Sequence, residues 1–178
     1  MIRGVSFGNF LIKQAVEDLG REFRRIRTFA TLSPIPGFVA WLTTAGAGIK
    51  RSPQLNETVL RAVEDKSLAP KDVPERLRRE VVELAAHYLV NAKRGADALD
   101  PVARFHLANG ARLERLNWMG DTSEPGLRQS LGLTANYVYR LADVERNHEA
   151  YAKTGKIVTT HEIETLTRRF TAPPARTR

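Results

Sequence analysis

The chain has 178 residues, which is long enough for one domain with a hydrophobic core. It is 42% hydrophobic, which is typical of a globular protein. Its first residues lack a signal-peptide pattern, and no apolar run reaches the roughly 18 to 20 residues that cross a bilayer. We therefore expect a cytoplasmic globular protein without a membrane partner. The absence of cysteine excludes disulfides and thiolate metal ligands. The net charge of +8 favours an anionic partner, and the few aromatic residues, 7%, favour a phosphorylated small molecule over nucleic acid.

The first predicted element is a glycine-containing loop that leads into a helix. Residues 3–9, RGVSFGN, have two glycines that let the backbone approach a phosphate, and the following helix would point its first N–H groups at such a ligand. Asn9 is the expected N-cap of this helix. The apolar positions on one helix face are Ile12, Ala15, Val16 and Leu19. A glycine turn without a ligand explains the same loop, so both interpretations stay open.

A strand and a proline-rich segment follow. Residues 27–32, RTFATL, are mixed and β-branched, which predicts a short strand. In SPIPGF, over 33–38, the prolines interrupt regular structure until Pro36, where a short helix can begin. Ser33 is held against these prolines, which suits a positioned hydroxyl, although a serine that bonds its own turn is the simpler alternative. Residues 43–54 are rich in Gly, Thr and Ser and predict a loop.

The middle of the chain predicts three helices. One is expected near residues 55–64, and a long one over 74–93. The third lies within DPVARFHLANG, residues 100–110. There Asp100 fits the N-cap, the following proline fits the first turn, and the Asn-Gly pair stops the helix.

The last part of the chain predicts two strands and further helices. In chain order they are a strand over 111–119, a turn and helix that begin at the Ser-Glu-Pro-Gly of 123–126, a strand over 133–141, a helix over 143–152 that Gly155 ends, a helix over 160–170, and a tail over 171–178 that we expect to be disordered. The alternation of helices and strands, without an internal repeat, predicts the α/β or α+β class in one domain.

Four histidines are candidates for acid–base chemistry. His106 lies on the short helix beside a turn, where its imidazole can face a cleft. His87 stands in an apolar helical stretch and fits a hydrogen-bonded core residue, whereas His148 and His161 fit exposed helix positions. No histidine and carboxylate have a metal-ligand spacing, so we expect no metal site.

Four segments together resemble the C-terminal catalytic region of malonyl-CoA decarboxylases. They are RGVSFGNFLIKQ, TFATLSPIPGF, ALDPVARFHLANGARLERLNWMGD and GLTANYVYRL, in the family's order from residue 3 to about 151. The resemblance implies a fold like that of the GNAT acyltransferases, with a mixed sheet and flanking helices. In that family the glycine loop lies inside the catalytic domain. Residues 3–170 are therefore expected to form the C-terminal part of that domain, without its first strands and the preceding helical domain.

The resemblance also implies an activity, the decarboxylation of malonyl-CoA to acetyl-CoA and CO2 in fatty-acid or malonate metabolism. Ser33 and His106 match the family's catalytic serine and histidine. The residues matched to substrate binding are Arg3, Gly4, Val5, Ser6, Phe7, Gly8, Asn9 and Tyr139. No cofactor is implied, because the coenzyme A thioester is itself the electron sink. The ending Arg-Thr-Arg, in place of a peroxisomal Ser-Lys-Leu, fits a bacterial cytoplasmic protein, and a homo-oligomer stays open.

The chemistry of this reaction suits the matched residue types. Loss of CO2 leaves an enolate, whose oxygen needs hydrogen-bond donors and whose α-carbon needs a proton. We expect His106, with a pKa near neutrality, to deliver the proton, and Ser33 to bond it while it holds the malonyl carboxylate. Two alternatives stay open. One is a GNAT-type acyltransferase, which shares the coenzyme A loop, and the other is a basic fragment that binds coenzyme A or nucleic acid without turnover.

Overall fold

The structure of the chain, a computed structural model, describes residues 7–26, 28–44, 49, 52–53, 55–57 and 73–171. Its helices are α1 (Phe7–Glu22), α2 (Phe38–Thr43), α4 (Glu75–Asn91), α5 (Pro101–Ala108), α6 (Glu124–Ser130), α7 (Leu141–Thr154) and α8 (His161–Thr171). Its strands are β1 (Thr28–Pro34), β2 (Lys93–Arg94), β3 (Asp97–Ala98), β4 (Arg112–Asn117) and β5 (Thr134–Arg140). Apart from β2 and β3, these are the elements that the sequence predicts in the described ranges.

A three-stranded sheet in the order β1-β5-β4 is the frame of the fold. Both outer strands pair antiparallel with β5, so that Ala135 has Ser33 on one side and Leu116 on the other. A parallel bridge from Leu113 to Thr159 adds a further segment beside β4, at the outer edge of the sheet. Helices that flank a small antiparallel sheet, with a parallel bridge beside it, confirm the predicted mixed class, α/β or α+β.

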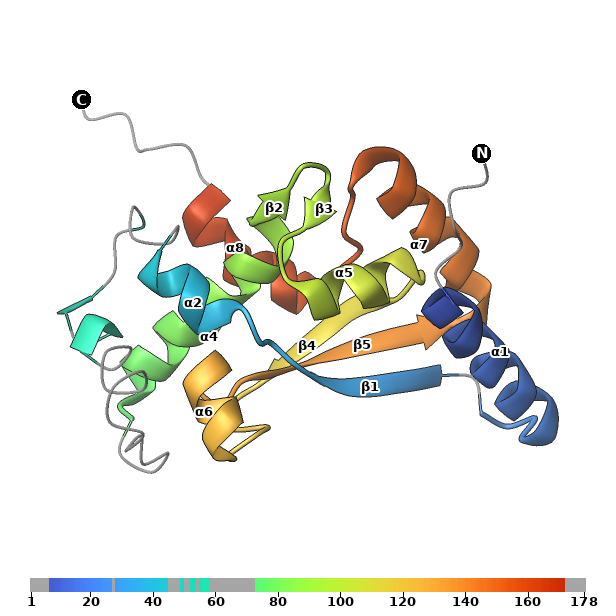
Figure 1. Cartoon of the computed structure of the whole chain (residues 1–178), viewed down its shortest axis with the longest axis horizontal. Helices are drawn as coiled ribbons and strands as arrows, with labels where there is room; N and C mark the ends of the chain where they lie inside the picture. The colour runs from blue at the N-terminus through green and yellow to red at the C-terminus, as the bar shows by residue number, and fades with distance from the viewer. Residues whose placement is uncertain are drawn as a thin grey trace.

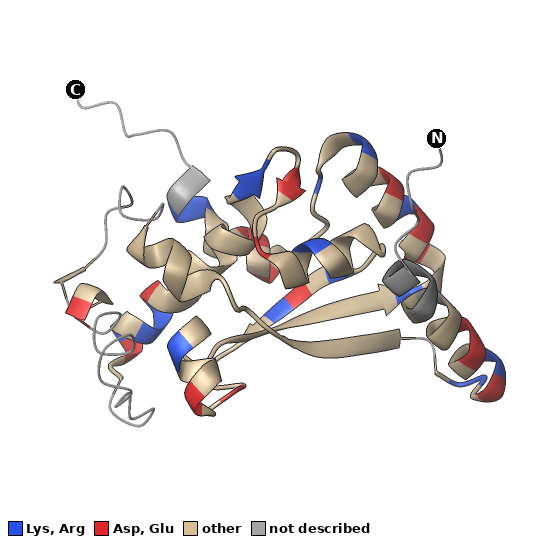
Figure 2. Cartoon of the chain, viewed as in Figure 1, with Lys and Arg blue, Asp and Glu red and all other residues tan. Residues whose placement is uncertain are grey.

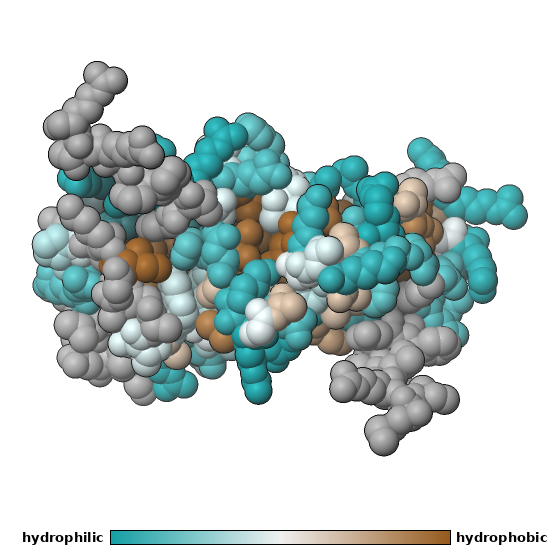
Figure 3. Space-filling model, turned by 90° about the horizontal axis from the view of Figure 1, so that it is seen from above, coloured by the Kyte–Doolittle hydropathy of each residue, from teal (hydrophilic) through white to brown (hydrophobic). Residues whose placement is uncertain are grey.

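The helices pack around this sheet, as Figure 1 shows. α5 lies across one face, α1 and α6 lie near opposite ends, and α4 and α8 pack against each other. The core combines buried side chains of the sheet and the helices: Leu42, Leu84, Leu89, Leu107, Leu113, Tyr137 and Ile163. Seen from above, hydrophilic side chains surround the apolar atoms that stay visible (Figure 3). In the described part of the chain, no helix has the length and apolar character needed to cross a membrane.

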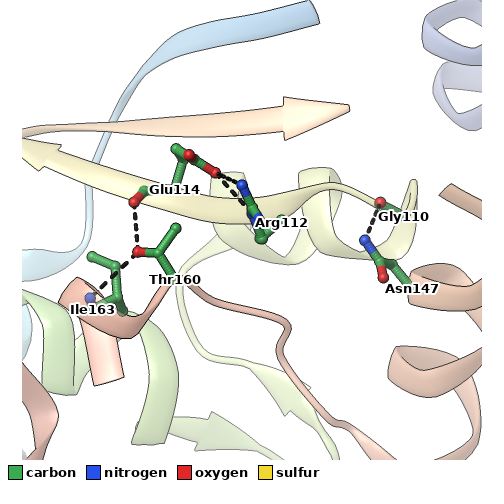
Figure 4. A network of polar contacts seen from close by, with 6 residues as sticks. All are labelled: Gly110, Arg112, Glu114, Asn147, Thr160 and Ile163. Atoms are coloured by element: carbon green, nitrogen blue, oxygen red, sulfur yellow. Dashed lines mark hydrogen bonds and ion pairs between the residues drawn. The ribbon is translucent and has the colours of Figure 1, made fainter. Parts of the chain in front are cut away.

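Two polar contacts hold β4 and the turn before it in place (Figure 4). Thr160, just before α8, donates its hydroxyl to the backbone carbonyl of Glu114 at 2.8 Å. Asn147 of α7 donates its side-chain amide to the carbonyl of Gly110 at 3.2 Å. Gly110 has a φ of 79°, and a Cβ there would lie 2.2 Å from the carbonyl oxygen of Val144. Only glycine therefore fits the turn between α5 and β4.

Charged residues lie mostly on the helices (Figure 2). β1, with the sequence TFATLSP, has none, and β5 carries only Arg140 at its end. On α4, the buried carboxylate of Glu83 accepts from Arg79 at 2.9 Å and from Arg169 of α8 at 3.1 Å. This double contact joins α4 to α8, while the strands that carry the site stay free of strong local charge.

Some local features differ from the prediction. α1 begins at Phe7, so Asn9 lies inside its first turn and is not the predicted N-cap. The first four N–H groups of an α-helix have no partner within the helix. A Gly-Asn pair is therefore tolerated in the first turn as well as at the N-cap. β1 runs on to Pro34, because a strand at the edge of the described sheet tolerates a residue without an N–H. Most of the loop and helix predicted over 43–64, and residues 172–178 of the predicted tail, lie outside the described residues.

Candidate active site

The pairing of β1 with β5 brings polar side chains onto the face of the sheet beneath α5. Ser33 pairs with Ala135, and Thr31 pairs with Tyr137. Directly opposite residues project to the same face, and so do residues two apart on one strand. Thr31 and Ser33 of β1 therefore share a face with Tyr137 and Tyr139 of β5.

α5 carries His106 in its last turn and directs it at that face. Asp100 caps the helix through two backbone N–H groups of the first turn, and the Asn-Gly pair ends it, as the sequence predicts. The buried residues of the helix are Ala103, His106 and Leu107. The imidazole consequently points into the protein.

The imidazole of His106 makes a hydrogen bond through each ring nitrogen. Nε2 lies 3.0 Å from Oγ of Ser33, and Nδ1 lies 2.7 Å from the hydroxyl oxygen of Tyr139. The Ser33 hydroxyl is in turn 2.9 Å from Oγ1 of Thr31. The ring also stacks on Tyr137, with centroids 4.5 Å apart and planes inclined by 17°. Side chains of β1 and β5 thus fix the position of a histidine that is 73 residues away from Ser33 in the sequence.

Burial determines the charge of this histidine. His106 is 7% exposed, and burial lowers its pKa from 6.5 to about 4. At neutral pH the imidazole is therefore neutral, so it donates from one ring nitrogen and accepts at the other. This differs from the near-neutral pKa expected from the sequence, because α5 and the sheet exclude the water that would stabilise an imidazolium. Burial also raises the pKa of the Tyr139 hydroxyl, which keeps that group protonated.

A cavity of about 240 Å³ lies beside Tyr139, between α1, α7 and the end of α5. Besides Tyr139, its walls combine apolar side chains with two carboxylates and an amide: Ile12, Val16, Leu141, Val144, Glu17, Glu145 and Asn109. Pockets for complete drug-sized ligands measure roughly 300 to 1,000 Å³. The cavity therefore has room for part of a ligand, and it connects α1 with the tyrosine that contacts His106.

The predicted site residues fall into two groups. The structure brings together Ser33, His106 and Tyr139. Phe7, Gly8 and Asn9 are predicted to belong to the phosphate loop, and they form the start of α1 instead. The other predicted loop residues, which lie outside the described residues, are Arg3, Gly4, Val5 and Ser6.

Two residues of the site, Thr31 and Tyr137, are not among those predicted from the sequence. Each stands two positions from a predicted site residue on the same strand, which is Ser33 for the first and Tyr139 for the second. Side chains two apart on a strand share a face. This spacing is the signal that would have found them.

The other three histidines lie elsewhere. His87 on α4 accepts at Nδ1 from the side-chain amide of Asn91 at 3.1 Å, as predicted, but it is half-buried and not a core residue. His148 and His161 are exposed on α7 and α8, as predicted. Within the described ranges, no three His, Asp or Glu side chains gather in the way that a metal ion requires.

Sequence and fold are both similar to those of one family. The family model of the malonyl-CoA decarboxylase C-terminal domain matches residues 1–176. The mitochondrial malonyl-CoA decarboxylase of Anser anser anser is 34% identical over 190 residues, covering 95% of this chain and 38% of that protein. The protein of the same name from Rattus norvegicus is 33% identical, with 95% and 39% covered.

Solved structures of malonyl-CoA decarboxylases agree with this finding. The structure from Rhodopseudomonas palustris is similar with a TM-score of 0.77 at 44% identity, covering 92% of this chain and 41% of that one. The structure from Agrobacterium vitis has a TM-score of 0.77 at 43% identity, with 93% and 42% covered. The chain thus spans about two fifths of the length of the relatives it matches.

Proposed function

The chain belongs to the malonyl-CoA decarboxylase family, and we propose that it converts malonyl-CoA to acetyl-CoA and CO2. The observation that carries the proposal is the buried contact of 3.0 Å between Oγ of Ser33 and Nε2 of His106. It combines a hydroxyl and an imidazole, which are groups suited to binding an anion and delivering a proton. The names of the relatives support malonyl-CoA as the substrate.

His106 is the general acid in this proposal. Loss of CO2 breaks the bond between the carboxyl carbon and the α-carbon, and its electron pair moves into an enolate of the thioester. Nε2 of the imidazolium then gives its proton to the α-carbon, a step that contributes roughly 100- to 10,000-fold. In the free protein the pKa of about 4 leaves the ring unprotonated at neutral pH. A malonyl carboxylate beside Nε2 would raise that pKa, because the opposite charge stabilises the imidazolium.

Ser33 orients the malonyl group in this proposal. Its hydroxyl lies between Nε2 of His106 and Oγ1 of Thr31, so it can donate to a substrate oxygen without leaving the pair. Thr31 holds the hydroxyl from the other side. We expect the Ser33 hydroxyl to donate to an oxygen of the malonyl carboxylate. A donor aimed at the enolate oxygen that develops as CO2 leaves would stabilise it by a further amount of roughly 3 to 4 kcal/mol.

The coenzyme A part of the substrate extends from this site toward α1 in the proposal. The residues proposed to bind it are Arg3, Gly4, Val5, Ser6, Phe7, Gly8, Asn9 and Tyr139. The cavity between Tyr139 and α1 supports this direction, and the first N–H groups of a helix suit phosphate oxygens. No cofactor takes part in the scheme, since the thioester accepts the electron pair.

The setting of the reaction is also part of the proposal. We propose a GNAT-like domain that serves malonate or fatty-acid metabolism in a bacterial cytoplasm, for which the bacterial sources of the solved relatives are the support. The proposed partner is malonyl-CoA and not nucleic acid. Assembly as a homo-oligomer is compatible with the scheme.

Two substitutions test the assigned roles. His106→Asn and Ser33→Ala should each lose most of the turnover of malonyl-CoA, while the affinity for coenzyme A, measured by calorimetry, stays unchanged. His161→Asn is the matched control, because this histidine is exposed on α8, and it should retain full turnover. Unimpaired turnover in either site variant would contradict the mechanism. Coenzyme A binding without CO2 release by the unaltered chain would support the alternative of a non-catalytic fragment.

A further inference from the structure

Asp100 makes more contacts than its helix cap requires. Its Oδ1 accepts from the backbone N–H groups of Val102 at 3.0 Å and Ala103 at 2.9 Å, which completes the N-cap of α5. Ser123 caps α6 with a single hydroxyl oxygen, which accepts from Gly126 at 3.2 Å. One oxygen therefore suffices for a cap. Asp100 nevertheless keeps a whole carboxylate at a position with 0% exposure, where an unpaired charge is strongly unfavourable.

The rest of the carboxylate contacts two other parts of the fold. Oδ2 accepts from the hydroxyl of Tyr88 on α4 at 3.3 Å, and both of these groups lie close against Gly37. Burial raises the pKa of Asp100, and these hydrogen bonds counteract that rise. Gly37 lies in the turn between β1 and α2, just after Ser33. One buried side chain thus connects the start of α5 with the turn beyond the serine.

The turn also fits closely against Tyr88. A Cβ on Gly37 would lie 2.2 Å from the Tyr88 hydroxyl oxygen and 3.6 Å from Oδ2 of Asp100. The Tyr88 ring is held in turn by Phe38 and Trp41 of α2, with centroid distances of 5.9 and 5.1 Å. The hydroxyl, the carboxylate and the turn therefore form one close-packed contact with little room to shift.

We propose that Asp100 is a positioning residue for the proposed decarboxylation. Its carboxylate caps the helix that carries His106 and, together with the Tyr88 hydroxyl that it accepts from, packs against the turn after Ser33, and so fixes the 3.0 Å contact between the serine and the histidine. Prolines at 34 and 36 stiffen the segment between Ser33 and Gly37, so a displacement of the turn is passed on to the serine. The effect on turnover rests on the proposed function, whereas the tie itself is a property of the fold.

Asp100→Asn tests this role in the 178-residue chain. The amide keeps an oxygen for the cap but presents an NH2 group, a donor, among groups that need an acceptor. We expect kcat for malonyl-CoA to fall by about 100-fold with KM little changed, the size of effect that a misplacement of about 1 Å produces. In nitrogen NMR spectra, the two ring-nitrogen shifts of His106 should be well separated in the unaltered chain. In the variant they should move toward each other as the tautomers begin to exchange.

Ser123→Ala is the matched control, because it removes an N-cap that is not bonded to the site. It should lower stability, measured by urea denaturation, and leave kcat and the ring shifts unchanged. The proposal is overturned if Asp100→Asn behaves in the same way. If the unaltered chain releases no CO2, the proposed function fails, but the ring shifts still test the tie.

Tyr88→Phe is a second variant that keeps both the cap and the buried carboxylate. It removes one donor to Oδ2, so it should move the His106 ring shifts in the same direction by a smaller amount. This variant decides the matter if Asp100→Asn does not fold. Ring shifts identical to those of the unaltered chain would then overturn the proposal.

Discussion

The ring of His106 lies nearly parallel to that of Tyr137, with 4.5 Å between the centroids. Tyr137 has 0% exposure, and among the described residues its hydroxyl has no hydrogen-bond partner. Leaving a buried hydroxyl without a partner costs about 1 to 3 kcal/mol. Tyr137 therefore supports the imidazole with its ring, and we expect its hydroxyl to lower the stability of the fold.

Tyr137→Phe should keep the stacked ring and remove the unpaired hydroxyl. We expect the free energy of unfolding, measured by urea denaturation, to rise by about 1 kcal/mol, with turnover near that of the unaltered chain. Tyr139→Phe is the matched comparison, because it removes the hydroxyl bonded to Nδ1 of His106, and it should lower both quantities. A clear loss of stability in Tyr137→Phe would show that its hydroxyl is paired, against this expectation.

The burial of His106 should make the protein less stable in mild acid. Its pKa is about 4 in the folded protein, against 6.5 for an unperturbed histidine. Between these values the unfolded chain binds a proton that the folded protein does not, so the free energy of unfolding falls as the pH drops from about 6.5 to about 4. The contribution amounts to about 3 kcal/mol, since one pKa unit corresponds to about 1.36 kcal/mol.

Urea denaturation at a series of pH values measures this effect. His106→Gln has no titrating ring. Over this pH window, its free energy of unfolding should therefore fall by about 3 kcal/mol less than that of the unaltered chain. His161→Asn changes an exposed histidine and should keep the acid sensitivity of the unaltered chain. If the stability of His106→Gln falls as steeply as that of the unaltered chain, another group is responsible.

The sequence predicts α5 well because its boundaries are set by local interactions. The Asp-Pro pair and the Asn-Gly pair each act within one turn of the helix. The contact of His106 with Ser33 is different, because it depends on how β1 pairs with β5 and spans 73 residues. No periodicity within one element sets such a register. A resemblance of several motifs to one family, and not spacing, identified that pair.

Other features escape prediction for physical reasons of their own. β2 and β3 have two residues each, too few for an alternating pattern, and form a hairpin around Gly95, whose φ is 66°. Asn9 is compatible with both a cap and a first helical turn, so sequence alone does not distinguish them. The lowered pKa of His106 arises from enclosure by α5 and the sheet, which only the tertiary structure provides.

Gly37 and Tyr88 allow a test of the packing behind the site. Gly37 has a φ of −94°, so its backbone permits alanine, but the added Cβ would lie 2.2 Å from the Tyr88 hydroxyl oxygen. Gly37→Ala alone should cost about 1 to 3 kcal/mol through overpacking. Adding Tyr88→Phe removes that oxygen, so the nearest atom to the added Cβ is Cζ of residue 88, at 3.4 Å. The double variant should therefore lose less free energy of unfolding than the two single variants lose together. Additive losses in urea denaturation would contradict the close packing.

Release of CO2 from carboxyl-labelled malonyl-CoA tests the central claim most directly. The 178-residue chain is assayed beside the malonyl-CoA decarboxylase from Rhodopseudomonas palustris, which serves as the positive control, and beside its own Ser33→Ala and His106→Asn variants. The proposal predicts that the unaltered chain forms CO2 and acetyl-CoA in equal amounts and that both variants lose this activity. Release by the relative alone, with none from the chain, would contradict it.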